Sequence, residues 1–472
     1  MDYTSLNLAV ERARTIRHSG RVSRVIGLTV ESEGPAVSLG HLCHIENLES
    51  GIRVEAEVVG FRDSRLLLMP LGDLKGITPG AVVVSTGDHL RAPVGRELIG
   101  RTLNGLGRPI DGLGRLITVE SRSVESRPPP PLVRPCISEP LLTGVKIIDL
   151  TCLCGKGQRL GVFSGSGIGK SVMLGMMARN STADINVIAL VGERGREVRE
   201  FIDHDLGPEG LKRSVVIAVT SDEAPLIRLK GAQVATTIAE YFRDQGLDVA
   251  LMMDSITRVA MAQREVGLAI GEPPATKGYT PSVYATLPRL LERAGAGERG
   301  TITGFYTVLV EGDDMNEPVS DLSRSILDGH VALSRRLAAR NQYPAVDVLQ
   351  SVSRLMRNVT GPETQELAAE VRELYAVFAE AEDLINIGAY NKGTSAKIDR
   401  AIDTVDALDE FFRQGIDEKA DYHESVRELA AILEKSRVVS EENTRQDTPN
   451  SMAQAPSIQQ PVTDSEKILV ST

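Results

Sequence analysis

Long apolar runs are absent from this 472-residue sequence: nowhere do about 18 uncharged apolar residues follow one another. We therefore expect neither a membrane-spanning helix nor a signal peptide. Cysteine is also scarce, and 4 cysteines in so long a chain suit a reducing, cytoplasmic compartment better than a disulfide framework. Cys152 and Cys154 have no second Cys/His pair at zinc-ligand spacing, so we expect small buried residues there and assign no structural metal.

An excess of positive charge is missing too. The chain has 53 Lys and Arg against 64 Asp and Glu, a formal net charge of -11. Nucleic-acid binding normally needs a basic face, so this balance argues against a nucleic-acid partner. Apolar residues, in contrast, make up 42% of the chain, which at this length is enough to bury the cores of two or three domains.

The first 95 residues show two patterns. For residues 1–19 we predict an N-terminal amphipathic helix, because apolar residues recur at helical spacing over 3–17 beside a basic side. The pattern is compatible both with packing on the protein itself and with docking on a partner or an anionic membrane surface. Residues 20–95 consist of short β-type runs separated by Gly, Pro and Asp, which predicts a β-barrel domain. We expect His41 and His44, which fall within it, to be ordinary barrel residues.

The remaining sequence divides into a core, a helical part and a tail. Over residues 96–360 apolar β runs alternate with helical stretches, which predicts an α/β domain with a mainly parallel sheet covered on both faces. The proline-rich residues 127–135 predict a stiff connector on the surface. Residues 361–440 have helical periodicity and predict a helical C-terminal domain, whereas the polar residues 441–472 predict a disordered tail. The predicted strands of the core include residues 160–163, 185–191, 215–219, 249–253 and 301–310.

A glycine-rich loop lies between a predicted strand, 158–163, and a predicted helix, 172–179, as in the phosphate-binding loop of ATPases. Glycines let the backbone N–H groups wrap around phosphates, while Lys170 reaches the outer phosphates and the Ser171 hydroxyl binds Mg²⁺. The usual pattern begins with glycine, and here Ser164 stands instead, so a strict pattern search would miss the loop. The predicted ATP-binding residues of this segment are Ser164, Gly165, Ser166, Gly167, Ile168, Gly169, Lys170, Ser171 and Val172.

Hydrolysis of ATP also needs a metal-binding carboxylate and a group that activates water. Asp254 ends the apolar run 249–253, where a strand terminus would aim its carboxylate at Mg²⁺; otherwise such an Asp is a helix cap or turn residue. Glu193 follows another apolar run and lies 23 residues after Lys170, so a parallel sheet would bring both to one edge. We predict Glu193 as the general base, the alternative being an exposed loop carboxylate in a charge-rich stretch.

Further motifs resemble the catalytic subunits of rotary ATP synthases and their relatives. These are GERGRE at 192–197, DSITR at 254–258, GEPPATKGY at 271–279 and YPAVD at 343–347. Within that superfamily the chain is similar above all to the flagellum-specific ATPases of the type III export apparatus, through VMLGMMAR at 172–179 and INIGAY at 385–390. The resemblance runs from about residue 20 to 435. It implies a RecA-like P-loop ATPase core with an N-terminal β-barrel and a C-terminal helical domain.

The resemblance also implies roles for single residues by position. Glu193 matches the catalytic carboxylate and Arg194 a contact to the γ-phosphate. Asp254 matches the Mg²⁺-associated aspartate, and Tyr343 a residue beside the adenine. Arg354 matches the arginine that enters the neighbouring subunit's site, where such a finger is worth about 10³ to 10⁵ in rate. Read without the family, Arg354 is one of many arginines, most of them solvated or salt-bridged. The catalytic residues that follow are Lys170, Glu193, Arg194 and Arg354.

The function implied by the resemblance is hydrolysis of ATP, with Mg²⁺, to support chaperone release and secretion of flagellar proteins. Homohexamers would act at the flagellar base, on the cytoplasmic face of the inner membrane, with peripheral membrane association. The implied partners are an export regulator, stalk proteins, the export gate and chaperone–cargo complexes.

Three alternatives share parts of this pattern. The virulence type III secretion ATPase has nearly the same mechanism. A rotary ATP synthase subunit is disfavoured by Glu193 for the non-catalytic type and by the segment 388–390 for the catalytic type. A hexameric RNA translocase would carry a basic front domain with exposed aromatics, and the front segment of this chain has few aromatics.

Overall fold

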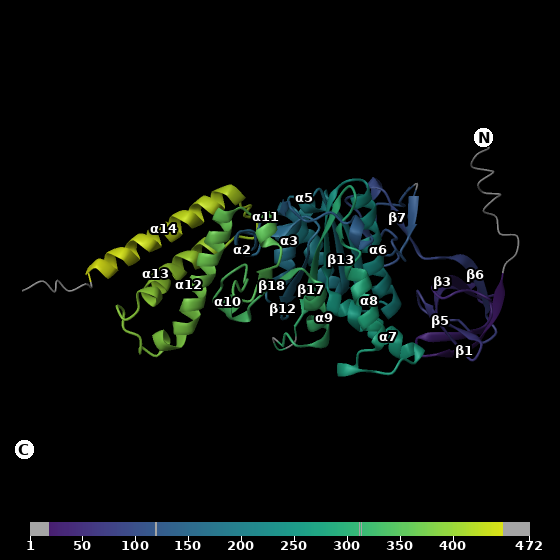
Figure 1. Cartoon of the computed structure of the whole chain (residues 1–472). Helices are drawn as coiled ribbons and strands as arrows, with labels where there is room; N and C mark the ends of the chain where they lie inside the picture. Colours follow the sequence, from purple (N-terminus) through teal and green to yellow (C-terminus); the bar gives the residue numbers. More distant parts are fainter. Residues whose placement is uncertain (1–17, 119, 311, 313, 447–472) are drawn as a thin grey trace, which may run out of the picture.

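The computed structural model describes residues 18–118, 120–310, 312 and 314–446, and its three parts lie in a row (Figure 1). A β-barrel forms one end, a large sheet flanked by helices forms the middle, and long helices form the other end. This arrangement confirms the predicted fold class. Residues 1–17, which carry the predicted N-terminal helix, lie outside the described residues.

The barrel is closed, with the strand order β1-β2-β5-β4-β3-β6 and antiparallel neighbours. Alternation of burial along β3 shows why this sequence forms it: Cys43 and Ile45 point into the barrel core, while His44 between them is half-exposed. His41 and His44 are both strand residues of the barrel, as predicted. The strands are β1 (Ser19–Ile26), β2 (Thr29–Glu33), β3 (His41–Asn47), β4 (Ile52–Arg62), β5 (Arg65–Pro70) and β6 (Val82–His89).

A buried ion pair joins the barrel to the middle of the molecule, and an exposed connector follows further along the chain. Lys230 of the core forms an ion pair with Glu57 of the barrel, with 2.7 Å between Nζ and Oε2, and both side chains are buried. After the strand pair β7 (Arg91–Val94) and β9 (Glu120–Ser123), the connector 127–135 runs over the surface, where Leu132 is fully exposed. Pro130 has φ −58° and ψ 144°, the polyproline conformation predicted for this segment, but Pro131–Val133 form a short 3₁₀ helix instead of an extended chain.

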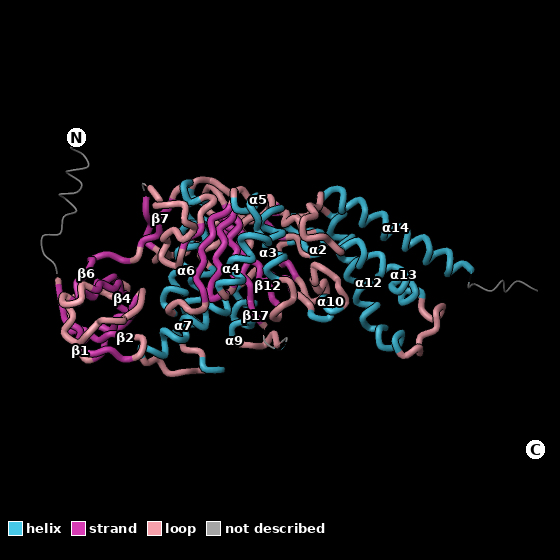
Figure 2. The backbone as a smooth tube through the Cα atoms, turned by 180° about the vertical axis from the view of Figure 1, so that it is seen from behind, coloured by secondary structure: helices cyan, strands magenta, loops and turns pink. Residues whose placement is uncertain are grey.

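The central sheet has the strand order β19-β18-β12-β17-β15-β13-β14-β8, with β16 paired to β17. Neighbours are parallel except at β16 and β19, and helices cover both faces (Figure 2). Along β13, Val187 and Ala189 pack in the core of one face, which includes α6 and α7, whereas Ile188 and Leu190 pack in the core of the other, which includes α3. Two-sided burial explains why these strands read as continuous apolar runs.

The strands of the core differ from the predicted ones by at most two residues at either end. Its strands are β8 (Thr102–Leu103), β10 (Pro140–Leu141), β11 (Cys154–Gly155), β12 (Arg159–Ser164), β13 (Ile185–Glu193), β14 (Ser214–Thr220), β15 (Asp248–Asp254), β16 (Gly295–Ala296), β17 (Thr301–Leu309), β18 (Gly329–Ala332) and β19 (Val352–Ser353). Its helices are α2 (Lys146–Thr151), α3 (Lys170–Asn180), α4 (Gly195–Glu200), α5 (Gly207–Leu211), α6 (Pro225–Asp244), α7 (Ile256–Ile270), α8 (Pro281–Leu291), α9 (Pro318–Ile326), α10 (Arg335–Ala339) and α11 (Met356–Val359).

The helical end consists of α12 (Pro362–Asn386), α13 (Ala396–Phe412) and α14 (Tyr422–Gln446). Helix α14 continues to Gln446, past the boundary predicted at residue 440, whereas residues 447–472 lie outside the described residues. The physical reason is that buried Leu429 and Leu433 hold the helix on the core, and no Pro or Gly interrupts it before Pro449.

Cys152 and Cys154 are both fully buried, as predicted. Cys43 is buried in the barrel, and Cys136 is exposed. Among the described residues, no helix combines the length and hydropathy needed to cross a membrane.

Candidate functional site

The glycine-rich loop connects the end of β12 to the first residue of α3. Gly167 and Gly169 have φ of 78° and 93°, a left-handed backbone that a side chain would strain, and Gly169 caps α3. Ile168 between them is 2% exposed and anchors the loop in the core below the sheet. Lys170 and Ser171 therefore lie in the first turn of α3, where the helix leaves its N–H groups free for phosphates.

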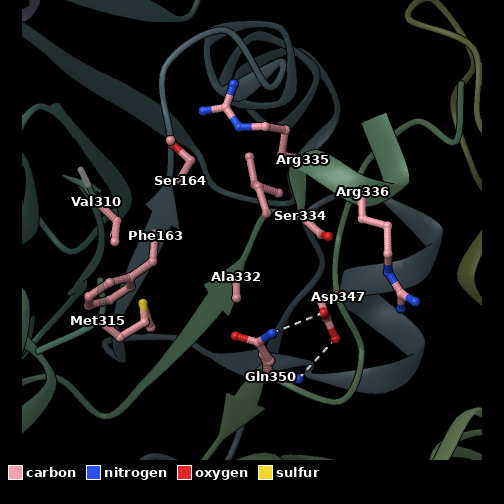
Figure 3. Close-up of a pocket in the computed structure, with 12 residues that line it drawn as sticks. Phe163, Ser164, Val310, Met315, Ala332, Ser334, Arg335, Arg336, Asp347 and Gln350 are labelled. Atoms are coloured by element: carbon pink, nitrogen blue, oxygen red, sulfur yellow. Dashed lines mark hydrogen bonds between the residues drawn. The ribbon is translucent and has the colours of Figure 1, made fainter. Parts of the chain in front are cut away.

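Ser164, the irregular first position, is the last residue of β12. Its backbone is extended, so this position does not require glycine. Its side chain lines a cavity of about 170 Å³ together with Arg335 and Gln350 (Figure 3). Gln350 donates hydrogen bonds to the carboxylate of Asp347. Among the described residues the buried Ser164 Oγ has no hydrogen-bond partner. The serine thus adds a polar group beside the loop without altering its curvature.

Lys170 lies between the two carboxylates that the sequence singled out. β13 and β15 are neighbours, with Leu190 opposite Asp254, so both strands end at the same edge of the sheet as the loop. The Lys170 ammonium donates to Asp254 Oδ1 and lies 3.8 Å from Glu193 Oε1. Asp254 is only 2% exposed, so its charge is balanced by Lys170 rather than by water.

Glu193 is electrostatically tuned by this setting. Burial and the nearby Asp254 carboxylate together raise the pKa of Glu193 to about 7, against the opposing effects of Lys170 and Arg258. A carboxylate whose pKa lies close to neutral pH is suited to accept a proton from water during hydrolysis. The alternative prediction, an exposed loop carboxylate, is wrong, since the Glu193 side chain is 16% exposed.

Two residues near this pair were not assigned from the sequence. Thr307 of β17 donates to Asp254 Oδ1 at 2.7 Å and so orients the carboxylate. Arg258 lies inside the DSITR motif, and its side chain packs against Gly192, where an added Cβ would lie 3.0 Å from Arg258 Cβ. The motif itself could have pointed to Arg258. Thr307 carried no signal, because a threonine in an apolar strand is common.

Three predicted residues remain: Tyr343 packs on the loop, Arg194 directly follows Glu193, and Arg354 lies away from the site. The Tyr343 ring packs on the loop, so that a Cβ added to Gly169 would lie 3.4 Å from Tyr343 Cε1, and 39% of the tyrosine is exposed. Arg194 caps α4, is 83% exposed and pairs with Glu197 at 3.4 Å. Arg354 does not lie at this site. Its backbone N–H donates to the carbonyl of Asp328, which lies beside the first residue of β12, whereas the phosphate-binding loop follows the last residue of β12.

Models of known protein families match each of the three parts of the chain. Residues 22–87, 144–353 and 360–431 match family models described as the ATP synthase alpha/beta family, beta-barrel domain; the ATP synthase alpha/beta family, nucleotide-binding domain; and the T3SS EscN ATPase C-terminal domain. The chain is 54% identical to the flagellum-specific ATP synthase of Bacillus subtilis over 92% of this chain and 99% of that protein. It is 47% identical to the type 3 secretion system ATPase of Xanthomonas euvesicatoria, over 89% of this chain and 95% of that protein.

A solved structure supports the same relationship. It is the assembled ATPase EscN in complex with its central stalk EscO, from the type III secretion system of enteropathogenic E. coli. It has a TM-score of 0.81 and 41% identity, covering 88% of this chain and 100% of that one. Sequence identity, domain order and fold agree over nearly the whole chain, and the chain therefore belongs to the ATP synthase alpha/beta family.

Proposed function

We propose that this chain is the ATPase of a flagellar type III export apparatus, hydrolysing ATP to ADP and phosphate to support chaperone release and secretion of flagellar proteins. The observation that carries the proposal is the 54% identity to a flagellum-specific ATP synthase over 92% of the chain. The paired Lys170 and Asp254 and the tuned Glu193 add the chemistry that ATP hydrolysis needs.

The alternatives are less well supported. A virulence-type secretion ATPase has the same architecture, but the identity to the type 3 relative is 47%. Residues 360–431 match a type III secretion ATPase C-terminal domain, which argues against a subunit of a rotary ATP synthase. Residues 22–87 match the beta-barrel domain of the ATP synthase family, which argues against an RNA translocase front domain.

In the proposed mechanism, the N-terminal N–H groups of α3 and the Lys170 ammonium bind the β- and γ-phosphates of ATP. Ser171 and Asp254 supply a hydroxyl and a carboxylate oxygen, the donors that Mg²⁺ takes, and would hold that ion. When bound, Mg²⁺ neutralises the charge that develops on the phosphates. Glu193 accepts a proton from the attacking water, while Arg194 contacts the γ-phosphate and Tyr343 lies beside the adenine.

The position of Arg354 supports a site shared between subunits. β12 has 6 residues and spans roughly 20 Å, so Arg354 at its start cannot reach ATP bound at its end. Arg354 is exposed, as an arginine that enters a neighbouring subunit must be. We infer a homohexamer in which Arg354 completes the site of the next subunit.

The proposal extends to the surroundings of the enzyme. EscN, a structural relative, was solved as an assembly with its central stalk EscO, and we infer a corresponding stalk protein for this hexamer. A flagellar export regulator, the export gate and chaperone–cargo complexes would be its further partners. The hexamer would act in the cytoplasm, at the cytoplasmic face of the inner membrane.

Deletion of the gene tests the cellular function. We expect secretion of filament protein to be lost and to return with the wild-type gene but not with a Glu193→Gln gene, since export would require hydrolysis. Filament protein is measured in the culture medium. Undiminished secretion by the deletion strain would exclude the flagellar assignment and leave the virulence one.

Two substitutions separate ATP binding from ATP hydrolysis. Lys170→Ala removes a charge-assisted bond to phosphate and should weaken ATP binding by about 10- to 100-fold. Glu193→Gln should keep ATP affinity and lower turnover by about 10² to 10⁴. Binding is measured with a fluorescent nucleotide and turnover by phosphate release, with Lys212→Ala, an exposed lysine paired with Glu209, as the control. Equal residual hydrolysis in both variants would remove Glu193 from its role.

The rate should also depend on pH through Glu193. A general base acts only when deprotonated, so with its pKa at about 7 in the free enzyme, kcat/KM should fall about tenfold per pH unit below 7 and level off above it. Steady-state hydrolysis from about pH 5.5 to 8.5 measures this profile. A rate independent of pH across this range would show that Glu193 is not the group that titrates.

Mixed hexamers test the shared site. Arg354→Ala and Glu193→Gln chains should each be nearly inactive, yet an equal mixture should regain roughly a quarter of the active sites. Each site has a probability of about one half of an intact Glu193 and about one half of an intact Arg354 from its neighbour. Phosphate release is measured after confirming that hexamers are mixed. The control replaces the Glu193→Gln chain with one carrying both substitutions, which should give no recovery. Equal rates in mixture and control would mean that Arg354 does not act across subunits.

A further inference from the structure

The turn between α13 and α14, residues 414–418, meets the core beside the nucleotide-binding loop. Its first residue, Gln414, is 4% exposed. The backbone N–H of Gln414 donates to the backbone carbonyl of Tyr343 at 3.0 Å. The residue proposed to lie beside the adenine is therefore bonded directly to the helical domain.

The Gln414 side chain is completely engaged. Its Oε1 accepts from the N–H of Lys146 at 2.9 Å, and its Nε2 donates to the carbonyls of Gly144 at 2.8 Å and Glu418 at 3.0 Å. An amide has two N–H donors, and both are used here, so the side chain has one orientation. Removing the amide would take a hydrogen-bond partner from three backbone groups, of which the carbonyl of Gly144 lies in a buried setting.

Two charged residues hold the same turn on the core. Arg179, at the end of α3, donates to the carbonyl of Ile416 at 2.6 Å. Lys146, at the start of α2, pairs with Glu418 at 2.9 Å. Since α3 begins with Lys170, the turn is tied to the helix that carries the phosphate-binding lysine as well as to Tyr343.

The residue before Tyr343 is held from the same side. Gln342 donates to the carbonyl of Asp409 at 2.6 Å and accepts from Arg413 at 3.1 Å, and both partners lie at the end of α13. On the other side, the Tyr343 ring packs on Gly169 of the loop. The tyrosine is thus placed between the phosphate-binding loop and a hydrogen-bonded segment of the helical domain.

We propose that Gln414 is a positioning residue for adenine binding: it locks the 414–418 turn on Gly144 and Lys146 and so holds Tyr343 against the loop. The ligand concerned is the base of an adenine nucleotide, and the inference rests on the proposed placement of Tyr343 beside the adenine. The alternative is that Gln414 only stabilises the junction of the two domains. In that case its loss would affect the phosphate and base portions of the site alike.

The test compares a ligand with a base to a ligand without one, using the full chain. ADP and pyrophosphate both carry a diphosphate, and neither has a γ-phosphate that the enzyme could hydrolyse. Gln414→Met keeps most of the side-chain volume and removes its hydrogen bonds, and we expect about tenfold weaker ADP binding with pyrophosphate binding within about twofold of wild type. Tyr343→Ala should weaken ADP binding similarly, and the double variant no more than the single ones.

A matched control is Gln365→Ala in α12, whose side chain also bonds two backbone carbonyls, those of Arg357 and Thr360. Binding of both ligands should be unchanged there. Glu418→Gln loosens the same turn more gently and should weaken ADP by about threefold without affecting pyrophosphate. It decides the question if Gln414→Met fails to fold.

Several outcomes would overturn the inference. Equal loss of ADP and pyrophosphate binding would assign Gln414 a structural role only, and unchanged ADP binding would assign it none. Additive effects of Gln414→Met and Tyr343→Ala would show that Gln414 acts through another residue. If Tyr343→Ala alone leaves ADP affinity intact, the placement of the adenine is wrong, whereas the roles of Lys170 and Glu193 are unaffected.

Discussion

The charge balance around Lys170 is the interaction on which the site depends. Asp254 and Glu193 end neighbouring strands in a setting with little water, and two negative charges so placed would repel each other without a cation between them. Lys170 is also the group proposed to bind the phosphates of ATP. On entry of ATP with Mg²⁺, Lys170 would therefore exchange Asp254 for phosphate as its partner. Asp254 would in turn exchange Lys170 for the metal ion. Thr307 would keep Asp254 oriented during this exchange, because its bond involves neither phosphate nor metal.

A parallel sheet explains why the cluster forms and also why it is incomplete. Strand ends of one direction gather Lys170, Asp254 and Glu193 at one edge, and the same geometry places Arg354 at the other. In the proposed hexamer, each chain would carry part of its own site and, at the far edge, Arg354 for the site of the next chain. Assembly would then be part of the chemistry, since a single subunit has no arginine from a neighbour at its own site.

The domains at the two ends are joined to the core in different ways. The barrel is tied to the core by the buried pair of Lys230 in α6 and Glu57 in β4, neither of which belongs to the phosphate-binding loop. The helical domain is tied through Gln414 to Tyr343, which packs on that loop. On the proposed placement of Tyr343 beside the adenine, a shift of the helices would reach the base through Tyr343, whereas Lys170 lies beside Asp254 of the core.

Short-range patterns were enough to find the strand, loop and helix around Lys170, and the rule that parallel strands end together was enough to expect Asp254 and Glu193 beside it, because these features depend on neighbouring residues and on strand direction alone. Family resemblance added Tyr343 and Arg354 by position. Other features depend on contacts between segments far apart in the chain: the edge at which Arg354 lies, the bond from Thr307 to Asp254, and the hold of Gln414 on Tyr343. No spacing in the sequence encodes them, since glutamine and threonine carry no distinctive pattern and acquire their partners only when helices and strands pack.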